Sequence, residues 1–111
     1  MEFDRFTISL LVSGTTPNTD ELQDAHLSHL ASLHDAGALL AAGPLSDPAG
    51  ELRGLSIFGV GVDEANALKA EDPAVRAGVF TVRVLPWQIP AGAMSFAPTF
   101  FPRSIKDVLG R

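Results

Sequence analysis

The sequence predicts an α+β protein in which two helices cover one face of a single antiparallel sheet. Three observations support this prediction: residues 3–12 alternate with the period of a strand, residues 19–36 follow the period of a helix, and residues 79–85 are rich in β-branched side chains. Two short apolar segments and a second helical segment lie between them. The resulting order, β-α-β-β-α-β, is that of a ferredoxin-like fold.

The first strand, residues 3–12, has two faces of different character. Phe6, Ile8 and Leu10 form a strongly apolar face. The alternate positions Arg5, Thr7 and Ser9 form a mixed face. We expect the mixed face to stay free of helices, and an uncovered face in so small a domain favours packing against a second sheet. The sequence therefore predicts a homodimer whose protomers meet face to face.

The first helix is expected over residues 19–36. Asn18 or Thr19 can cap its N-terminus, and Gly37 suits the left-handed position that ends a helix. One stripe of this helix carries Leu22, His26, His29, Leu30, Leu33 and Ala36. Two histidines therefore lie on the face that should pack inward.

The remaining elements are separated by turn-forming residues. We expect strands over residues 38–42, 54–60 and 79–85 and a helix over residues 64–70. Asp72 followed by Pro73 is typical of the start of a further helical turn, which we expect to end at Gly78.

The composition indicates a small acidic domain. Of 111 residues, 46% are hydrophobic, and 13 acidic side chains outnumber 8 basic ones to give a net charge of −5. This excess argues against nucleic acid or an anionic membrane as partner, because both require a basic surface. The absence of cysteine excludes disulfides and thiolate chemistry. No signal peptide and no membrane-spanning run is evident, so we expect a cytoplasmic location.

The sequence divides into an expected domain over residues 1–90 and a C-terminal extension over residues 91–111. The extension combines Phe96, Phe100 and Phe101 with several prolines, which prevent a long helix or a central strand. Its aromatic content is too high for a disordered tail, so we expect it to dock on its own subunit or on its partner's. Residues 104–109 can add a closing helical turn.

His26 and Asp72 are the candidate catalytic residues. An imidazole suits proton transfer near neutral pH, and a carboxylate on its other nitrogen fixes the tautomer and stabilises the charged form. The structural alternative is a half-buried histidine bound to a backbone carbonyl and an aspartate that only caps the helix at Pro73. Both roles are compatible for Asp72, because a capping carboxylate has a second oxygen. Spacing alone leaves open whether the two residues meet.

Other motifs argue against a metal or an organic cofactor. His29 and His34 share the helix of His26, but no HExxH motif and no cysteine accompanies them. The glycines of Gly59-Val60-Gly61 lack the third glycine of a dinucleotide-binding loop. We therefore expect neither metal nor cofactor.

The candidate substrate-binding residues are Phe6, Arg83 and Trp87. The two aromatic side chains can line a pocket, although large apolar side chains belong to the core by default. Arg53 and Arg83 can meet an anionic substrate, although arginines are more often found at a rim or in a salt bridge.

Several short segments together resemble a known family. They are HLSHL (residues 26–30), AGALLAAGPL (36–45), LRGL (52–55), EDPAV (71–75) followed by Ala77-Gly78, and Pro86-Trp87. In this order, over about residues 3–90, they are similar to the YCII-related (YciI-like) domain family. The extension after Pro90 departs from the family pattern and can reshape or cover a cleft.

The resemblance implies a dimeric α+β barrel with a His–Asp pair in a cleft between helix and sheet, which corresponds here to His26 and Asp72. Related activities include a dehydrochlorinase that acts on chlorinated hydroxyquinol-type compounds, and the fold is similar to that of muconolactone isomerases. The first hypothesis is therefore a cofactor-independent enzyme that catalyses isomerisation or elimination on a small cyclic or aromatic metabolite. The second is a non-catalytic dimer that binds a small ligand or a partner protein. A cofactor-free monooxygenase is a third, which the sequence neither supports nor excludes.

Overall fold

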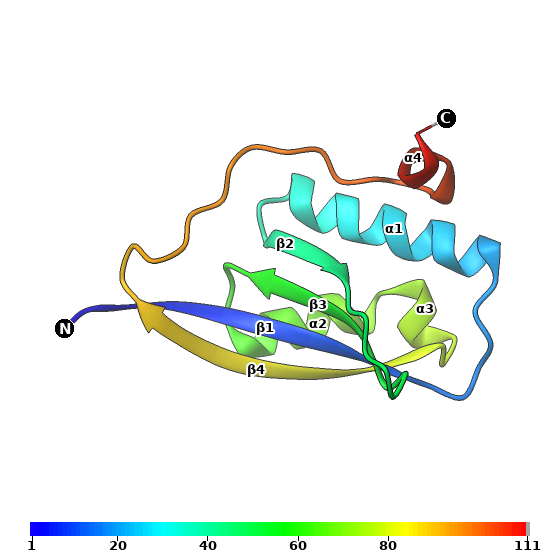
Figure 1. Cartoon of the computed structure of the whole chain (residues 1–111), viewed down its shortest axis with the longest axis horizontal. Helices are drawn as coiled ribbons and strands as arrows, with labels where there is room; N and C mark the ends of the chain where they lie inside the picture. The colour runs from blue at the N-terminus through cyan, green and yellow to red at the C-terminus, as the bar shows by residue number, and fades with distance from the viewer. Residues whose placement is uncertain (111) are drawn as a thin grey trace.

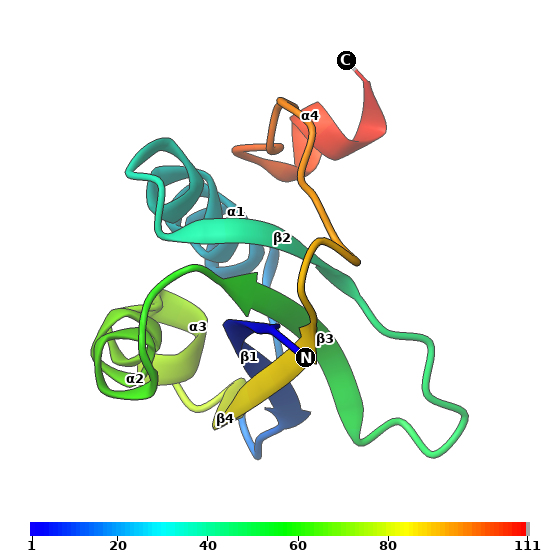
Figure 2. The same cartoon turned by 90° about the vertical axis from the view of Figure 1, so that its left-hand side faces the viewer.

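The structure is a computed structural model that describes residues 1–110. Four strands form one antiparallel sheet in the order β2-β3-β1-β4, and helices cover one of its faces (Figure 1, Figure 2). The strands are β1 (Phe3–Ser13), β2 (Leu39–Pro44), β3 (Leu52–Phe58) and β4 (Phe80–Pro90). The helices are α1 (Asp20–Asp35), α2 (Val62–Ala70), α3 (Pro73–Arg76) and α4 (Ile105–Leu109). The predicted β-α-β-β-α-β order is confirmed, with the second helical region divided into α2 and α3.

The helices begin and end at residues that the sequence marks. Thr19 caps α1 by accepting a hydrogen bond from the backbone N–H of Leu22 at 3.1 Å, and Gly37 follows the helix with a φ of +82°. Asp72 caps α3, whose first residue is Pro73. Within residues 1–110, no helix has the length and apolar character needed to cross a membrane. The cytoplasmic location stays a prediction.

The last strand is longer than the sequence predicted. The expected strand over residues 79–85 continues to Pro90 as β4, which pairs with β1 from Phe80 opposite Ser13 to Pro90 opposite Phe3. Pro86 and Pro90 lie within this added part of the strand, and neither can donate a backbone hydrogen bond. They are tolerated here because β4 lies at the edge of the sheet, where one side of the strand needs no partner.

The prediction of which β1 face the helices cover is wrong. Thr7, Ser9 and Leu11 are buried beneath the helices, whereas Phe6, Ile8, Leu10 and the other even-numbered positions of the strand face the open side. The Thr7 hydroxyl is accommodated under the helices because it donates to the Val60 carbonyl at 2.6 Å. Hydrophobicity identifies the more apolar face of a strand, but it does not decide which face the connecting helices cover.

The covered side holds two apolar clusters with polar residues between them. The first consists of Leu11, Ala74, Val79 and Phe80. The second consists of Leu33, Leu39, Phe58 and Ala65. Ser9 separates them along β1, because Leu11 belongs to the first cluster and Thr7 lies opposite Phe58 of the second. Ser56 lies opposite Ser9 on β3, so a polar seam crosses the sheet between the clusters.

The C-terminal extension runs from the end of β4 to α1 of the same chain, where α4 lies (Figure 1, Figure 2). The Phe6 and Phe96 rings make a T-shaped contact at a centroid distance of 5.7 Å, and the Phe101 ring stacks on His34. The expected closing turn is present as α4, which Ser104 caps. The division into residues 1–90 and 91–111 stays a prediction, and Arg111 lies outside the described residues.

Candidate active site

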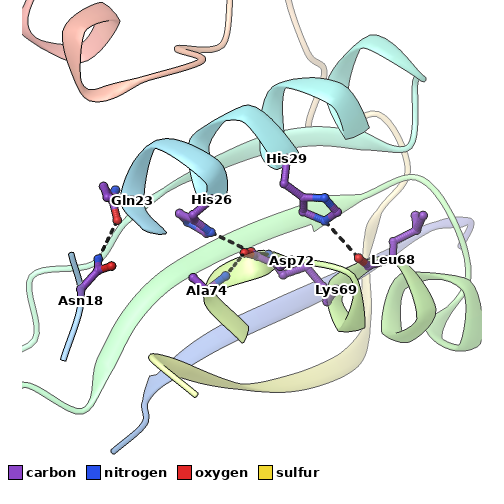
Figure 3. Close-up of polar contacts among 8 residues, drawn as sticks. All are labelled: Asn18, Gln23, His26, His29, Leu68, Lys69, Asp72 and Ala74. Carbon is purple, nitrogen blue, oxygen red and sulfur yellow. Dashed lines mark hydrogen bonds and ion pairs between the residues drawn. The ribbon is translucent and has the colours of Figure 1, made fainter. Parts of the chain in front are cut away.

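A buried histidine and a buried aspartate meet between α1 and α3 (Figure 3). His26 projects from the inward face of α1 and is 6% exposed, and Asp72 at the start of α3 is fully buried. His26 Nδ1 lies 2.7 Å from Asp72 Oδ2. Because a carboxylate only accepts, Nδ1 carries a proton, and in the neutral form of the ring Nε2 carries the lone pair. Asp72 Oδ1 accepts the N–H of Ala74 at 2.9 Å, so one carboxylate both caps α3 and orients the imidazole.

Lys69 completes this buried cluster and was missed in the sequence. Its side chain is 1% exposed, and Nζ donates to Asp72 Oδ2 at 3.2 Å, so Lys69 and His26 share one carboxylate oxygen. The signal that could have found it is helical spacing. Lys69 follows the buried Ala65 by four residues and therefore lies on the inward stripe of α2, three residues before Asp72. Lysine is rarely buried without an anionic partner.

The electrostatics of the cluster keep the carboxylate ionised. Burial alone raises the pKa of Asp72, but the hydrogen bond from His26, the charges of His26 and Lys69, and the Ala74 amide together lower this pKa below its usual value. Burial lowers the pKa of Lys69, and the adjacent Asp72 carboxylate partly opposes this effect. The site therefore presents an imidazole oriented by an ionised carboxylate, and Lys69 contacts the same carboxylate oxygen.

The other two histidines have different surroundings. His29 Nε2 donates to the Leu68 carbonyl at 3.0 Å, and burial lowers the pKa of His29 more than the nearby Asp72 carboxylate raises it (Figure 3). His34 stacks on Phe101 at a centroid distance of 4.0 Å. In the part of the chain that the structure describes, no three His, Asp or Glu side chains are grouped as a metal site would require.

A cavity of about 430 Å³ lies beside His26. It is bounded by α1, by β2 and β3, and by the C-terminal extension, and most of its wall is apolar. Arg53 is the only permanently charged side chain among the described residues that line it, and the buried Ser56 adds a hydroxyl. The lining residues are Leu11, Asn18, Gln23, His26, Leu27, Leu30, Ala42, Gly43, Pro44, Arg53, Gly54, Leu55, Ser56, Phe80, Phe101, Pro102 and Val108.

The structure places the three predicted substrate-binding residues away from this cavity. Phe6 lies opposite Trp87, and Arg83 lies opposite Leu10, so all three project from the open face of the sheet. None of them is among the lining residues. The two-residue period of β1 and β4 causes this separation, because these positions alternate with those that face the helices.

These features define a class of protein: a small α+β domain with a buried His–Asp pair beside an apolar cavity. The model of the YCII-related domain matches residues 9–88, and the chain belongs to this family. A search of curated proteins finds no match.

Solved structures with a similar fold include one enzyme in complex with a small molecule. It is 5-chloro-2-hydroxyhydroquinone dehydrochlorinase (TftG) from Burkholderia phenoliruptrix AC1100, in complex with 2,5-dihydroxybenzoquinone. The TM-score is 0.52 at 22% sequence identity, over 76% of this chain and 93% of that chain. At this identity the similarity shows the fold alone.

Proposed function

We propose that this protein is an enzyme that catalyses isomerisation or elimination on a small cyclic or aromatic metabolite, with His26 as the proton acceptor and donor. The observation that supports this most strongly is the 2.7 Å contact between His26 Nδ1 and Asp72 Oδ2 beside the cavity. Asp72 is the orienting residue, and Lys69 holds the carboxylate in place. A neutral imidazole oriented in this way is suited to accept a proton at neutral pH.

The proposed step moves a proton through Nε2, which makes no hydrogen bond to any residue in the range 1–110. Nε2 takes a proton from a C–H or O–H group of the substrate, and the Asp72 carboxylate stabilises the resulting imidazolium. In an elimination, the released electron pair forms a double bond while chloride leaves with its bonding electrons. In an isomerisation, the imidazolium returns the proton to a different carbon. Catalysis of this type contributes a factor of about 10²–10⁴.

The lining of the cavity supports a hydroxylated ring as substrate. A volume of about 430 Å³ is at the lower end of the range for ligand sites and suits one ring with its substituents. The apolar wall can pack against the ring, while Arg53 can attract a phenolate or enolate oxygen. The ligand and substrate that the TftG title prints are hydroxylated six-membered rings, and we propose a compound of that class for this protein.

We also propose that the protein is a homodimer formed through the open face of the sheet. The apolar residues of this face are Phe6, Ile8, Leu10, Leu55, Ile57, Leu85 and Trp87. Arg83 lies beside Leu10 on the same face, and Phe96 of the extension contacts Phe6. Leu85 and Trp87 are each more than a third exposed in the single chain. A contiguous apolar surface on a sheet is typical of a protein interface. As in the sequence-based prediction, the two protomers meet sheet against sheet. The interface is now formed by the apolar face of β1 and not by the mixed face.

The test is turnover of 5-chloro-2-hydroxyhydroquinone by His26→Ala and Asp72→Asn proteins, followed as chloride release. We expect His26→Ala to lower kcat by a factor of about 10²–10⁴. Asp72→Asn should also lower kcat, because an amide that donates to Nδ1 favours the wrong tautomer. His29→Gln is the matched control on the same helix and should retain activity, since His29 bonds only to a backbone carbonyl. Unchanged turnover in a folded His26→Ala protein would contradict the enzyme proposal and favour a non-catalytic binding protein.

A further inference from the structure

The C-terminal extension supplies part of the cavity wall. Phe101, Pro102 and Val108 line the cavity, although the YCII-related domain matches the chain only as far as residue 88. The segment that distinguishes this chain from the family pattern is therefore the segment that shapes its site.

Phe101 is held firmly in that wall. Its ring stacks on His34 with a centroid distance of 4.0 Å and an interplanar angle of 8°, and it packs against the apolar cluster that contains Leu33 and Phe58. The residues that follow are tied to the same helix. Arg103 pairs with Asp35 on α1, and the backbone N–H of Ile105 donates to Asp24 on α1 at 2.7 Å.

We propose that Phe101 is a specificity-determining residue that limits the cavity to single-ring substrates. The inference rests on the proposed function only in taking this cavity as the substrate site. Phe101 lines the cavity, and its phenyl group has about the size of the second ring of a fused bicyclic compound, so its removal would open about that much space. A side chain stacked on one helix and packed against a core cluster cannot move aside without losing those contacts, each of which is favourable.

The experiment measures the binding of two hydroxyquinones to the full chain by titration calorimetry. The probes are 2,5-dihydroxybenzoquinone, with one ring, and 2-hydroxy-1,4-naphthoquinone, with two fused rings. We expect the wild-type protein to bind the single-ring probe at least about tenfold more tightly, which is the usual range for size exclusion in an apolar pocket. Phe101→Ala should reduce this preference by about tenfold or more, because it opens the space for the second ring.

Phe100→Ala is the matched control, because its neighbouring phenyl ring is 99% exposed and lines no part of the cavity. Its preference should match that of the wild type. If Phe101→Ala does not fold, as judged by circular dichroism, Phe101→Leu should lower the preference in the same direction by about threefold, since it removes less volume. An unchanged ratio in the folded variant would overturn the proposal, as would equal binding of the two probes, or no binding of either, by the wild type.

The binding ratio separates this inference from the proposed function. A ratio that shifts with Phe101→Ala supports the role of Phe101 even where His26→Ala retains full turnover, a result that rejects only the enzyme proposal. A ratio that stays constant while His26→Ala abolishes turnover rejects only the role of Phe101.

Discussion

The face of the sheet beneath the helices is more polar than the face left open. On the covered face, Thr7, Ser9 and Ser56 are buried, and the His26–Asp72–Lys69 cluster lies above the sheet between α1 and α3. The open face carries mostly large apolar side chains of β1, β3 and β4, together with Arg83. These few polar groups therefore lie where water is excluded, and a hydrogen bond to an ionised carboxylate is stronger there than at the surface.

Burying polar groups costs free energy unless they form hydrogen bonds. Most of the buried polar groups on the covered face are paired in this way. Asp72 accepts hydrogen bonds from His26, Lys69 and Ala74, and Thr7 donates to Val60. Among the described residues, only the Ser9 hydroxyl is buried without a partner. The open face differs in that its large apolar side chains have no helix above them, and a contiguous apolar patch of this kind is typical of an interaction surface.

The largest effect on stability is expected from Asp72→Ala. This change removes the cap of α3 and leaves the buried Lys69 ammonium without a counter-charge. Breaking a buried ion pair in this way costs about 3–5 kcal/mol of unfolding free energy, measurable by urea denaturation. Glu71→Ala is the adjacent exposed control and should stay within about 0.5 kcal/mol of the wild type.

A double variant sharpens this prediction. Lys69→Met in the Asp72→Ala background removes the unpaired charge, and replacing both members of a buried pair by apolar groups is often close to neutral. The double variant should therefore be more stable than Asp72→Ala alone. A double variant that is less stable would show that Lys69 is not held by the Asp72 charge.

Ile8→Lys tests the proposal that the open face is the dimer interface. Ile8 lies at the centre of the open face, between Ile57 and Leu85. A buried ammonium at the centre of an interface should weaken the proposed dimer by about 2 kcal/mol or more, an increase of about 30-fold in its dissociation constant. Sedimentation equilibrium measures this constant. Asn66→Lys, on the exposed side of α2, adds the same charge and should leave the association unchanged; equal effects of the two variants would argue against this interface.

The two faces also show what the sequence predicts and what it leaves open. Element order follows from periodicity and from residues such as Gly37 and Asp72-Pro73, whose effects are local. The contact between His26 and Asp72 depends on how α1 packs against α3. The spacing of the two residues along the chain does not predict this packing. Two further features depend on contacts between distant segments: which face of β1 the helices cover, and the position of Phe101 in the cavity wall. Both became visible only in the structure.

A smaller difference in unfolding free energy is expected between substitutions at Thr7 and Ser9, two polar residues of the covered face. Thr7→Val removes the hydroxyl that satisfies the Val60 carbonyl, so it should lower the unfolding free energy by about 1 kcal/mol. Ser9→Ala removes a hydroxyl that has no partner, so it should be neutral or stabilising by about 1 kcal/mol. Urea denaturation of the two variants measures the difference. A loss of stability in Ser9→Ala as large as that in Thr7→Val would show that the Ser9 hydroxyl is partnered.

The smallest effect is a pH dependence that originates at His29 on the covered side. Burial lowers the folded-state pKa of His29, and the Asp72 carboxylate opposes this shift while Lys69 and His26 add to it. Between that lowered value and the unfolded value of about 6.5, the unfolded chain binds more protons, so stability increases with pH. The contribution of His29 is therefore complete above about pH 6.5 and is lost as the pH falls through the folded-state pKa. His29→Gln, which keeps a donor for the Leu68 carbonyl, should flatten this part of the urea-midpoint profile relative to the wild type. An equally steep profile in the variant would assign the dependence to other groups.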